Sequence, residues 1–338
     1  MEAKTKAKLK NLFRIFLFLS SLVILFFLLE EIGFDKVGEV FVKVGIGGML
    51  ILIVCEIMEN GSDALALYFT LPEKKNFLRI FSSNCLGALI NQIIPWEVGE
   101  LVKVGLIKEV TGSENSIKSV VLWNYIYKLS KGCALFAIVI LSLVVYAFVD
   151  DPYFKTNTFF IVALCALLGY LPYLGMMLLL KLNISEKIAK ILKYLGKKNP
   201  DEFIEKAKKM DRDLNLFRKE RPSDYKKVFW IQFFARFVAL FSYFLCIRFA
   251  GFGSYTAPTI MLAFCAVKLG NYILAFIPMK LGVGEGIGYV IFNFVGFSGA
   301  DGGLITFIAR IKTLIAMGIV SSLILFKPKD TKDKNDKI

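Results

Sequence analysis

The residues in this sequence most able to do chemistry are charged side chains set inside long apolar stretches. A charge at the centre of a membrane helix costs about 2.5–3.5 kcal/mol on insertion scales, so a charge that is kept there is a candidate for binding or transport. The buried positions of this kind are Glu56, Glu59, Asp63, Glu97, Glu100, Lys103, Lys128, Lys131, Arg236, Lys268, Lys280, Glu285, Arg310 and Lys312. Their carboxylates could carry protons, and their cations could hold a phosphate through charge-assisted hydrogen bonds.

Two similar motifs place some of these charges beside a proline and a glycine. The first reads Ile94-Pro95-Trp96-Glu97-Val98-Gly99-Glu100, and the second reads Ile277-Pro278-Met279-Lys280-Leu281-Gly282-Val283-Gly284-Glu285. Proline ends one helix, and glycine permits a tight turn and the close approach of a ligand. The helix that starts after each motif would present free backbone N–H groups, which bind anions.

We therefore expect a substrate-binding site built from the two motifs and the nearby cations. Its members would be Pro95, Trp96, Glu97, Gly99, Glu100, Lys103, Lys128, Arg236, Lys268, Pro278, Lys280, Gly282, Gly284, Glu285 and Arg310. Glu100 and Glu285 could carry protons or only neutralise a helix N-terminus. Arg236 could hold a phosphate or form an ion pair with Glu56 or Glu59.

Two further lysines and one aromatic residue have simpler interpretations. For Lys128 and Lys131 we expect the long side chains to reach the cytoplasmic interface. For Trp96 packing is favoured over stacking on a head group. Glu56, Glu59, Asn60 and Asp63 recur at helical spacing, so we expect this polar face to point into the bundle.

The sequence favours no metal, cofactor or catalytic residue. It has no histidine, which excludes imidazole bases and histidine metal ligands. Its six cysteines form no C-x-x-C pair and lie in or beside apolar stretches, as small buried hydrophobic residues do.

The elements that must position these residues are membrane helices. Of the 338 residues, 56% are hydrophobic and 21% are charged, and the mean hydropathy is +0.61. We expect an all-α polytopic membrane protein, since about 20 apolar residues cross a bilayer. The six predicted crossings are 12–33, 45–70, 120–149, 157–180, 228–250 and 303–326.

Two more apolar segments, 77–110 and 255–298, are interrupted at the two motifs. Lys and Arg gather at residues 1–14, 71–79, 181–227 and the tail, so the positive-inside rule puts both termini in the cytoplasm. Each interrupted segment must then leave and return on the same side. We therefore expect two re-entrant hairpins that enter from opposite faces and line a cavity.

The motif prolines are 183 residues apart. Shifting the crossings 45–70 and 120–149 by this distance gives 228–253 and 303–332, close to the predicted crossings 228–250 and 303–326. This predicts an inverted repeat, as in secondary transporters. The predicted parts are 1–150 (first repeat), 151–180 (first helix of the second repeat), 181–227 (basic amphipathic cytoplasmic loop), 228–326 (rest of the second repeat) and 327–338 (cytoplasmic tail).

The 181–227 segment has 15 Lys and Arg against 8 Asp and Glu. Its apolar residues, which include Ile184, Ile188, Leu214 and Phe217, suggest one or two amphipathic helices on the inner leaflet. A solvated linker between the repeats is the alternative.

The motifs also resemble those of a known family. Asn91-x-x-x-Pro95-x-x-x-Gly99-Glu100-x-x-Lys103 and Pro278-x-x-x-Gly282-x-Gly284-Glu285-Gly286 resemble stretches of the lysylphosphatidylglycerol synthase transmembrane family. Lys103 stands where arginine is common, and Met279-Lys280 replaces a small or glycine-rich pair. The resemblance implies movement of anionic or head-group-modified lipids between leaflets, without the soluble aminoacyl-transferase domain of the larger relatives.

Together these features predict a lipid flippase rather than an enzyme. The cargo would be a phosphate-bearing lipid, anionic or head-group-modified, with isoprenoid lipids included. The alternative is a membrane enzyme or accessory subunit acting on a lipid-linked substrate. We expect a multi-pass protein of the cell membrane. The net charge of +14 points to anionic phospholipid head groups as partners and not to nucleic acid, because the basic stretches flank apolar spans. A homo-oligomer is left open.

Overall fold

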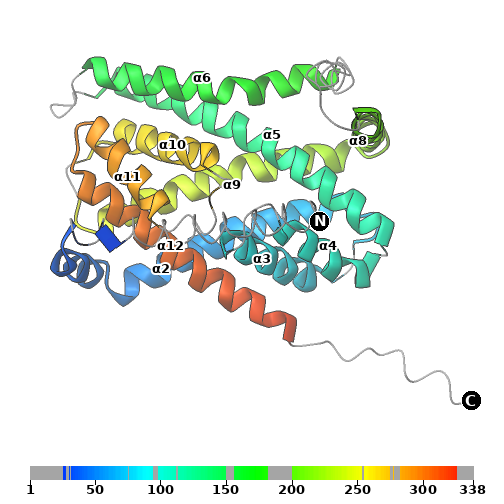
Figure 1. Cartoon of the computed structure of the whole chain (residues 1–338), viewed down its shortest axis with the longest axis horizontal. Coiled ribbons are helices and arrows are strands. Elements are labelled where there is room, and N and C mark those ends of the chain that lie inside the picture. The colour runs from blue at the N-terminus through cyan, green and yellow to red at the C-terminus, as the bar shows by residue number, and fades with distance from the viewer. Residues whose placement is uncertain are drawn as a thin grey trace, which may run out of the picture.

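The structure is a computed structural model of the whole chain. It describes residues 26–27, 30, 32–74, 76–93, 98–111, 113–149, 156–181, 200–252, 255–274, 277 and 282–325. Within these ranges the chain forms ten α-helices, one short 3-10 turn and no strand (Figure 1). The predicted all-α fold is confirmed.

Four helices are long and apolar enough to cross a membrane, by length and composition. They are α2 (Phe34–Thr70), α5 (Ser113–Tyr146, with the apolar span from Asn115), α9 (Pro222–Phe249) and α12 (Gly299–Ser322). Many of their large apolar side chains are exposed, such as Val42 at 81% and Ile46 at 84%. Exposed apolar surface of this extent suits a lipid environment and not water.

Helix α2 starts earlier than the sequence predicted. The expected crossing began at residue 45, but the helix begins at Phe34 and changes direction at Gly45, where φ is 62° and ψ is 174°. A positive φ is easy for glycine and costly for other residues, so the kink falls at this position. The predicted crossing 12–33 lies mostly outside the described residues.

Both interrupted segments form two short helices. The first gives α3 (Phe77–Ile93) and α4 (Val98–Thr111), and the second gives α10 (Ala257–Ile273) and α11 (Val283–Phe294). At 1.5 Å per residue even the longest is only about 25 Å, less than the roughly 30 Å of a bilayer core. Figure 1 places α3 and α4 near one end of the molecule and α10 and α11 near the other.

The helix contacts follow a repeated pattern. α2 and α9 form the most extensive contact of the fold. α3 packs against α12 as α10 packs against α5, and α2 packs against α12 as α9 packs against α5. A shift of 183 residues carries α2 to α9, α3 to α10 and α5 to α12, so each contact has a counterpart.

Helices α6 (Thr156–Lys181) and α8 (Pro200–Glu220) complete the described fold. α6 coincides with the predicted crossing 157–180 and packs on α5 and α10, where the Tyr170 hydroxyl donates to the Cys265 carbonyl at 2.7 Å. Of the basic segment, residues 182–199 lie outside the described ranges.

Helix α8 corrects one expectation about the basic segment. Leu214 and Phe217 are 4% and 5% exposed, and they belong to a buried cluster with residues of α2, α5 and α9 such as Ala66, Val120 and Val228. Burial against protein removes these side chains from water without any lipid. This part of 181–227 is therefore a helix packed on the bundle, and it is neither a solvated linker nor a helix whose Leu214 and Phe217 lie on the inner leaflet.

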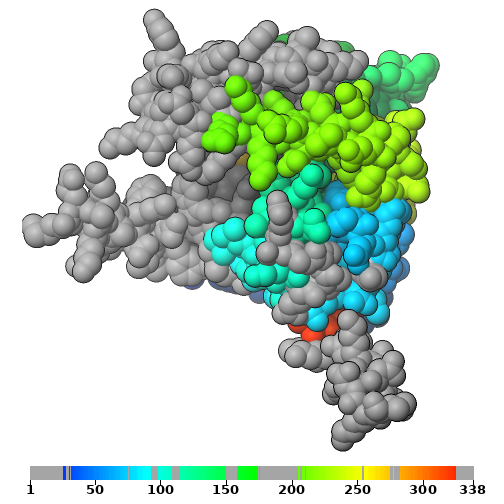
Figure 2. Space-filling view, turned by 90° about the vertical axis from the view of Figure 1, so that its right-hand side faces the viewer, coloured from blue at the N-terminus to red at the C-terminus, as the bar shows by residue number. Residues whose placement is uncertain are grey.

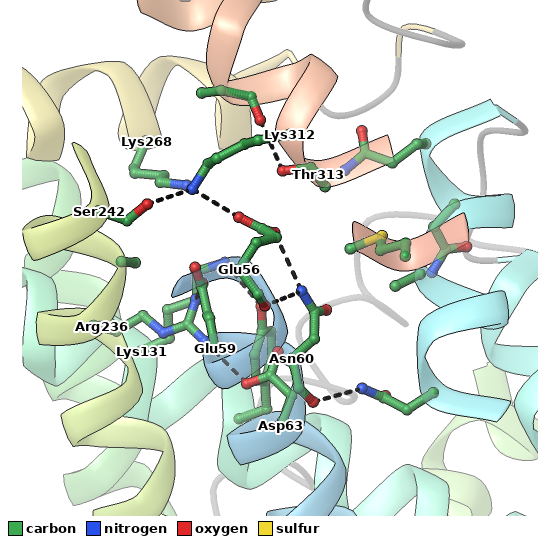
Figure 3. A pocket seen from close by; sticks show the side chains of 18 of the residues that line it. Glu56, Glu59, Asn60, Asp63, Lys131, Arg236, Ser242, Lys268, Lys312 and Thr313 are labelled. Carbon is green, nitrogen blue, oxygen red and sulfur yellow. Dashed lines mark hydrogen bonds and ion pairs between the residues drawn. The ribbon is translucent and has the colours of Figure 1, made fainter. Parts of the chain in front are cut away.

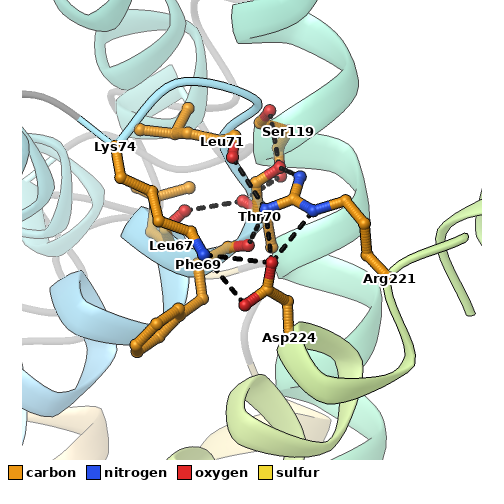
Figure 4. Close-up of polar contacts among 8 residues, drawn as sticks. All are labelled: Leu67, Phe69, Thr70, Leu71, Lys74, Ser119, Arg221 and Asp224. Atoms are coloured by element: carbon orange, nitrogen blue, oxygen red, sulfur yellow. Dashed lines mark hydrogen bonds and ion pairs between the residues drawn. The ribbon is translucent and has the colours of Figure 1, made fainter.

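The junction between α8 and α9 also holds the end of α2. The Arg221 guanidinium donates to the carbonyl oxygens of Phe69, Thr70 and Leu71 at 2.8–3.2 Å, and Asp224 accepts from both Arg221 and Lys74 (Figure 4). The last carbonyls of a helix have no partner within it, so an arginine here acts as a cap. Figure 2 shows this end of the molecule, with α8 and the start of α9 (yellow-green) beside the end of α2 (blue).

Candidate functional site

A polar pocket of about 350 Å³ lies at the centre of the bundle, between seven helices. One wall is the polar face of α2, where Glu56, Glu59, Asn60 and Asp63 follow each other at helical spacing (Figure 3). This confirms that the polar face of the second predicted crossing points into the bundle. The other walls come from α3, α4, α5, α9, α10 and α12.

Arg236 of α9 bridges two carboxylates of α2. Its Nη1 lies 2.7 Å from Glu59 Oε1, and its Nη2 lies 3.0 Å from Asp63 Oδ1, with the arginine side chain only 3% exposed. The planar guanidinium suits such a double contact. Of the two hypotheses for Arg236, the structure shows the ion pair, with Glu59 as one predicted partner and Asp63 as an additional one.

Asp63 has further partners around it. The Gln232 amide, in the orientation that satisfies both of its groups, donates to Asp63 Oδ1 at 2.8 Å and accepts from Trp123 Nε1. The guanidinium carbon of Arg236 lies 5.5 Å from the centre of the Tyr127 ring. The bridge between α2 and α9 is thus held in a network of aromatic and amide groups.

Glu56 pairs with a different helix. Its Oε2 lies 2.8 Å from Lys312 Nζ of α12, and Lys312 also donates to Ser242 Oγ of α9 at 2.6 Å. Asn60 Nδ2 donates to Glu56 Oε1 at 3.2 Å. These contacts, drawn in Figure 3, tie α2, α9 and α12 together through one carboxylate.

The first motif contributes a further charged pair to the pocket. Lys103 is 3% exposed, lies 3.0 Å from Glu100 Oε1, and places its Nζ 4.3 Å from the centre of the Trp123 ring. Asn91 of α3 donates to Glu100 Oε1 and accepts from the Gly99 N–H at 2.7 Å. A free N–H at the start of α4 is therefore already satisfied by a side chain, as in helix capping.

Three more lysines line the pocket. Lys268 of α10 does so as predicted, with its Nζ 5.4 Å from the centre of the Phe264 ring. Lys131 was expected at the cytoplasmic interface, but it lies in the pocket, where its Nζ donates to the Tyr127 hydroxyl at 2.9 Å and faces the Tyr272 ring. The nearby aromatic faces attract its ammonium group, which explains the inward position. Lys128 is exposed at the pocket edge.

The second motif lies mostly away from this pocket. Glu285, in the first turn of α11, is fully buried, and its Oε1 lies 3.1 Å from Arg310 Nε of α12. Gly282 has φ 74° and begins α11, and Gly284 lies against the Arg310 guanidinium. None of these four residues lines the central pocket.

Several predicted site residues lie outside the described ranges: Pro95, Trp96, Glu97, Pro278 and Lys280. The sequence reasoning also missed residues that the structure places in the pocket. Lys312 and Lys131 were recognised as intramembrane charges but not assigned to the site, although their position in apolar runs was a signal. Nothing in the sequence singled out Ser242, Asn84 or Tyr243.

The comparisons with known proteins agree with this architecture. Residues 11–321 match the family described as the lysylphosphatidylglycerol synthase TM region. Neither the curated proteins nor the solved structures include a significant match to the chain. Because the family match covers nearly the whole chain, including the helices described above up to Ser321, this multi-pass membrane protein belongs to the lysylphosphatidylglycerol synthase TM region family.

Proposed function

We propose that this protein moves a phosphate-bearing lipid between the two leaflets, using the central pocket as its binding site. The observation that carries the proposal is a cation-rich cavity enclosed by the candidate membrane spans. Polar cavities at membrane depth mark substrate pathways, because charges there are otherwise costly. Membership of a lipid-related family supports the same conclusion.

We further propose the architecture of an alternating-access transporter, with six crossings and two re-entrant hairpins in an inverted repeat. Support comes from the two pairs of short helices near opposite ends of the molecule and from the matched helix contacts. In such transporters the two repeats rock around a fixed midplane site. Both hairpins contribute to this pocket, through Glu100 and Lys103 on one side and Lys268 on the other.

The ion pairs formed by the acidic side chains of the pocket favour transport over catalysis. Each of the four carboxylates that line the pocket in the described part of the chain has a cationic partner: Arg236 for Glu59 and Asp63, Lys312 for Glu56, and Lys103 for Glu100. A general base must be able to reach a substrate proton. Carboxylates held in ion pairs instead organise a binding site, which is what a carrier needs.

The proposed topology can be tested by labelling single cysteines introduced at Trp96 and Met279 in membranes. Neither hairpin tip should react with a bulky impermeant reagent applied from the side opposite to its entry. Both termini, tagged in the same vesicles, should be accessible from the cytoplasmic side. Labelling of both tips from the far aqueous side would contradict the re-entrant arrangement.

The transport activity can be tested with the full chain in proteoliposomes. With fluorescent phosphatidylglycerol or, in a parallel preparation, fluorescent phosphatidic acid in both leaflets, an impermeant quencher should bleach the inner pool of at least one of the two lipids only when the protein is present. Arg236→Lys should slow this exchange about tenfold, since an ammonium group does not fork between Glu59 and Asp63 as a guanidinium does.

The matched control for that variant is Lys43→Gln. Lys43 is exposed on α2 and lies outside the pocket, so its loss should leave exchange unchanged. No difference between liposomes with and without the wild-type protein would refute the lipid-transport proposal.

A further inference from the structure

The charges that line the central pocket do not balance. Among the described residues that line it, six cationic side chains face four carboxylates, which leaves a formal excess of two positive charges. The cations are Lys103, Lys128, Lys131, Arg236, Lys268 and Lys312, and the carboxylates are Glu56, Glu59, Asp63 and Glu100. An excess of charge inside a membrane protein is unfavourable unless an ion of opposite sign compensates it.

Lys128 is exposed, so the excess inside the pocket falls on Lys131 and Lys268, which are half-buried. The four carboxylates are bound by Arg236, Lys312 and Lys103, as described above. Among the described residues, neither Lys131 nor Lys268 has a carboxylate at ion-pair distance; their partners are the Tyr127 hydroxyl and the faces of aromatic rings. Aromatic rings attract an ammonium group but do not neutralise it.

These two lysines act on the same region of space. They project from α5 and α10, which pack against each other, and both line the one pocket (Figure 3). The positive charges of Lys131, Lys268 and Lys312 all act on the carboxylate of Glu59. An anion placed between Lys131 and Lys268 would therefore meet two ammonium groups that contact no carboxylate of the described residues.

We propose that Lys131 and Lys268 form an anion subsite that selects a phosphomonoester head group, which carries two negative charges. The inference rests on the proposed lipid-binding role of the pocket and adds to it the charge of the cargo. A phosphomonoester has a second pKa near 6 and so carries about two charges at neutral pH, whereas a phosphodiester carries one. A head group with an added amine carries still less negative charge and leaves the excess unmatched.

The size and lining of the pocket suit this cargo. Its volume of about 350 Å³ lies at the small end of the usual range for ligand sites, large enough for a head group but not for whole acyl chains. Phe264, Ala239 and Met317 supply apolar surface beside the charged groups, where the start of a lipid chain can pack.

Binding can be measured by calorimetry on the purified full chain with three probes that share one alkyl chain. The probes are dodecyl phosphate, its methyl diester and dodecyltrimethylammonium. Near pH 8 the monoester should bind about tenfold more tightly than the diester, and the cationic probe should not compete. Lowering the pH to about 5 should weaken the monoester alone, because its second proton returns.

Variants can test whether Lys131 and Lys268 cause the preference for the monoester. Lys131→Gln combined with Lys268→Gln should bring monoester and diester to equal affinity, while Lys131→Arg with Lys268→Arg and the surface control Lys43→Gln should keep the preference. The glutamine variant could fail to fold, which gel filtration would show. In that case the pH dependence of monoester binding to the wild-type protein still tests the inference. Equal affinity for both esters in the wild-type protein would overturn the inference and leave lipid transport standing.

One more titration distinguishes a lipid phosphate from free inorganic phosphate as the ligand. Inorganic phosphate alone should bind much more weakly than dodecyl phosphate, because it lacks the alkyl chain that packs on apolar surface. Equal binding of the two would overturn the assignment to a lipid. Loss of exchange in proteoliposomes with probe binding intact would instead count against the proposed function.

Discussion

The two proline–glycine motifs are alike in sequence, yet the structure uses their glutamates differently. Glu100 lies at the pocket, where it contacts Lys103 and Asn91 from its own hairpin. Glu285 is sealed away and pairs with Arg310 of α12. The first motif thus supplies polar groups to the cavity, and the second fastens its hairpin to a neighbouring helix. Similar sequence in two motifs need not imply equal function.

The packing of glycines shows the same contrast. Gly99 and Gly87 bring the backbones of α3 and α4 together within the first hairpin, whereas Gly288 and Gly302 bring α11 against α12. The first hairpin is therefore tight in itself, and the second is tight against the bundle. If the repeats move relative to each other, the α11–α12 unit should move as one body.

The largest effect should follow from breaking the buried pair of the second motif. Glu285→Gln leaves Arg310 largely buried without its counter-charge, so we expect a loss of about 3–5 kcal/mol in the free energy of unfolding. Thermal unfolding of the detergent-purified protein would measure it. Replacing both partners, as Glu285→Gln with Arg310→Met, should recover much of the loss. A wild-type unfolding temperature for the single variant would contradict the fastening role.

A smaller effect is expected at the close contact of the first hairpin. A Cβ at Gly99 would overlap with the Gly87 carbonyl oxygen, so Gly99→Ala must push α3 and α4 apart. Overpacking of this kind costs typically about 1–3 kcal/mol. The lipid exchange rate should fall as well, since Lys103 and Glu100 move with α4.

The matched control is Gly105→Ala, on the same helix, where no atom lies within 4 Å of the added carbon. This variant should be neutral or slightly stabilising, because alanine favours a helix over glycine by roughly 0.5–1 kcal/mol. Equal damage from both variants would show that the loss reflects alanine in α4 in general and not the hairpin contact.

The smallest change in stability should come from Glu100→Gln. Glutamine keeps an oxygen that can accept from Asn91 and Lys103, and the Trp123 ring still faces the buried Lys103 ammonium group, so we expect a loss of about 1 kcal/mol in the free energy of unfolding. The exchange rate should nevertheless fall, because Lys103 loses its counter-charge in the pocket. Unchanged exchange in both Glu100→Gln and Glu285→Gln would remove any transport role for these carboxylates.

Much of the fold could be predicted because its signals are local. Hydropathy located α5, α6, α9 and α12, and the two motifs located the breaks between short helices. The partner of Arg236 could also be narrowed to the acidic face of α2, since opposite charges on packed helices pair. The start of α2 was harder, because a single glycine turn joins two helical stretches that hydropathy treats separately.

The remaining features depend on contacts between distant segments. Lys131 was expected at the interface because its place near a basic end suggested it, but the rings of Tyr127 and Tyr272 draw it inward. Lys312 could be seen as a membrane charge, yet its contact with Glu56 requires knowing that α12 lies against α2. The burial of Leu214 and Phe217 required the position of α8.

The cap that Arg221 places on the end of α2 has a mechanical consequence. Two carbonyls of α2 and that of Leu71, which follows it, accept from the residue that precedes α9, and these two helices carry the opposing partners Glu59 and Arg236 further along their length. Separating α2 from α9 at that end would break several charge-assisted bonds at once. We expect α2 and α9 to pivot about the Arg221 contacts. The two helices should therefore separate most at the ends farthest from Arg221.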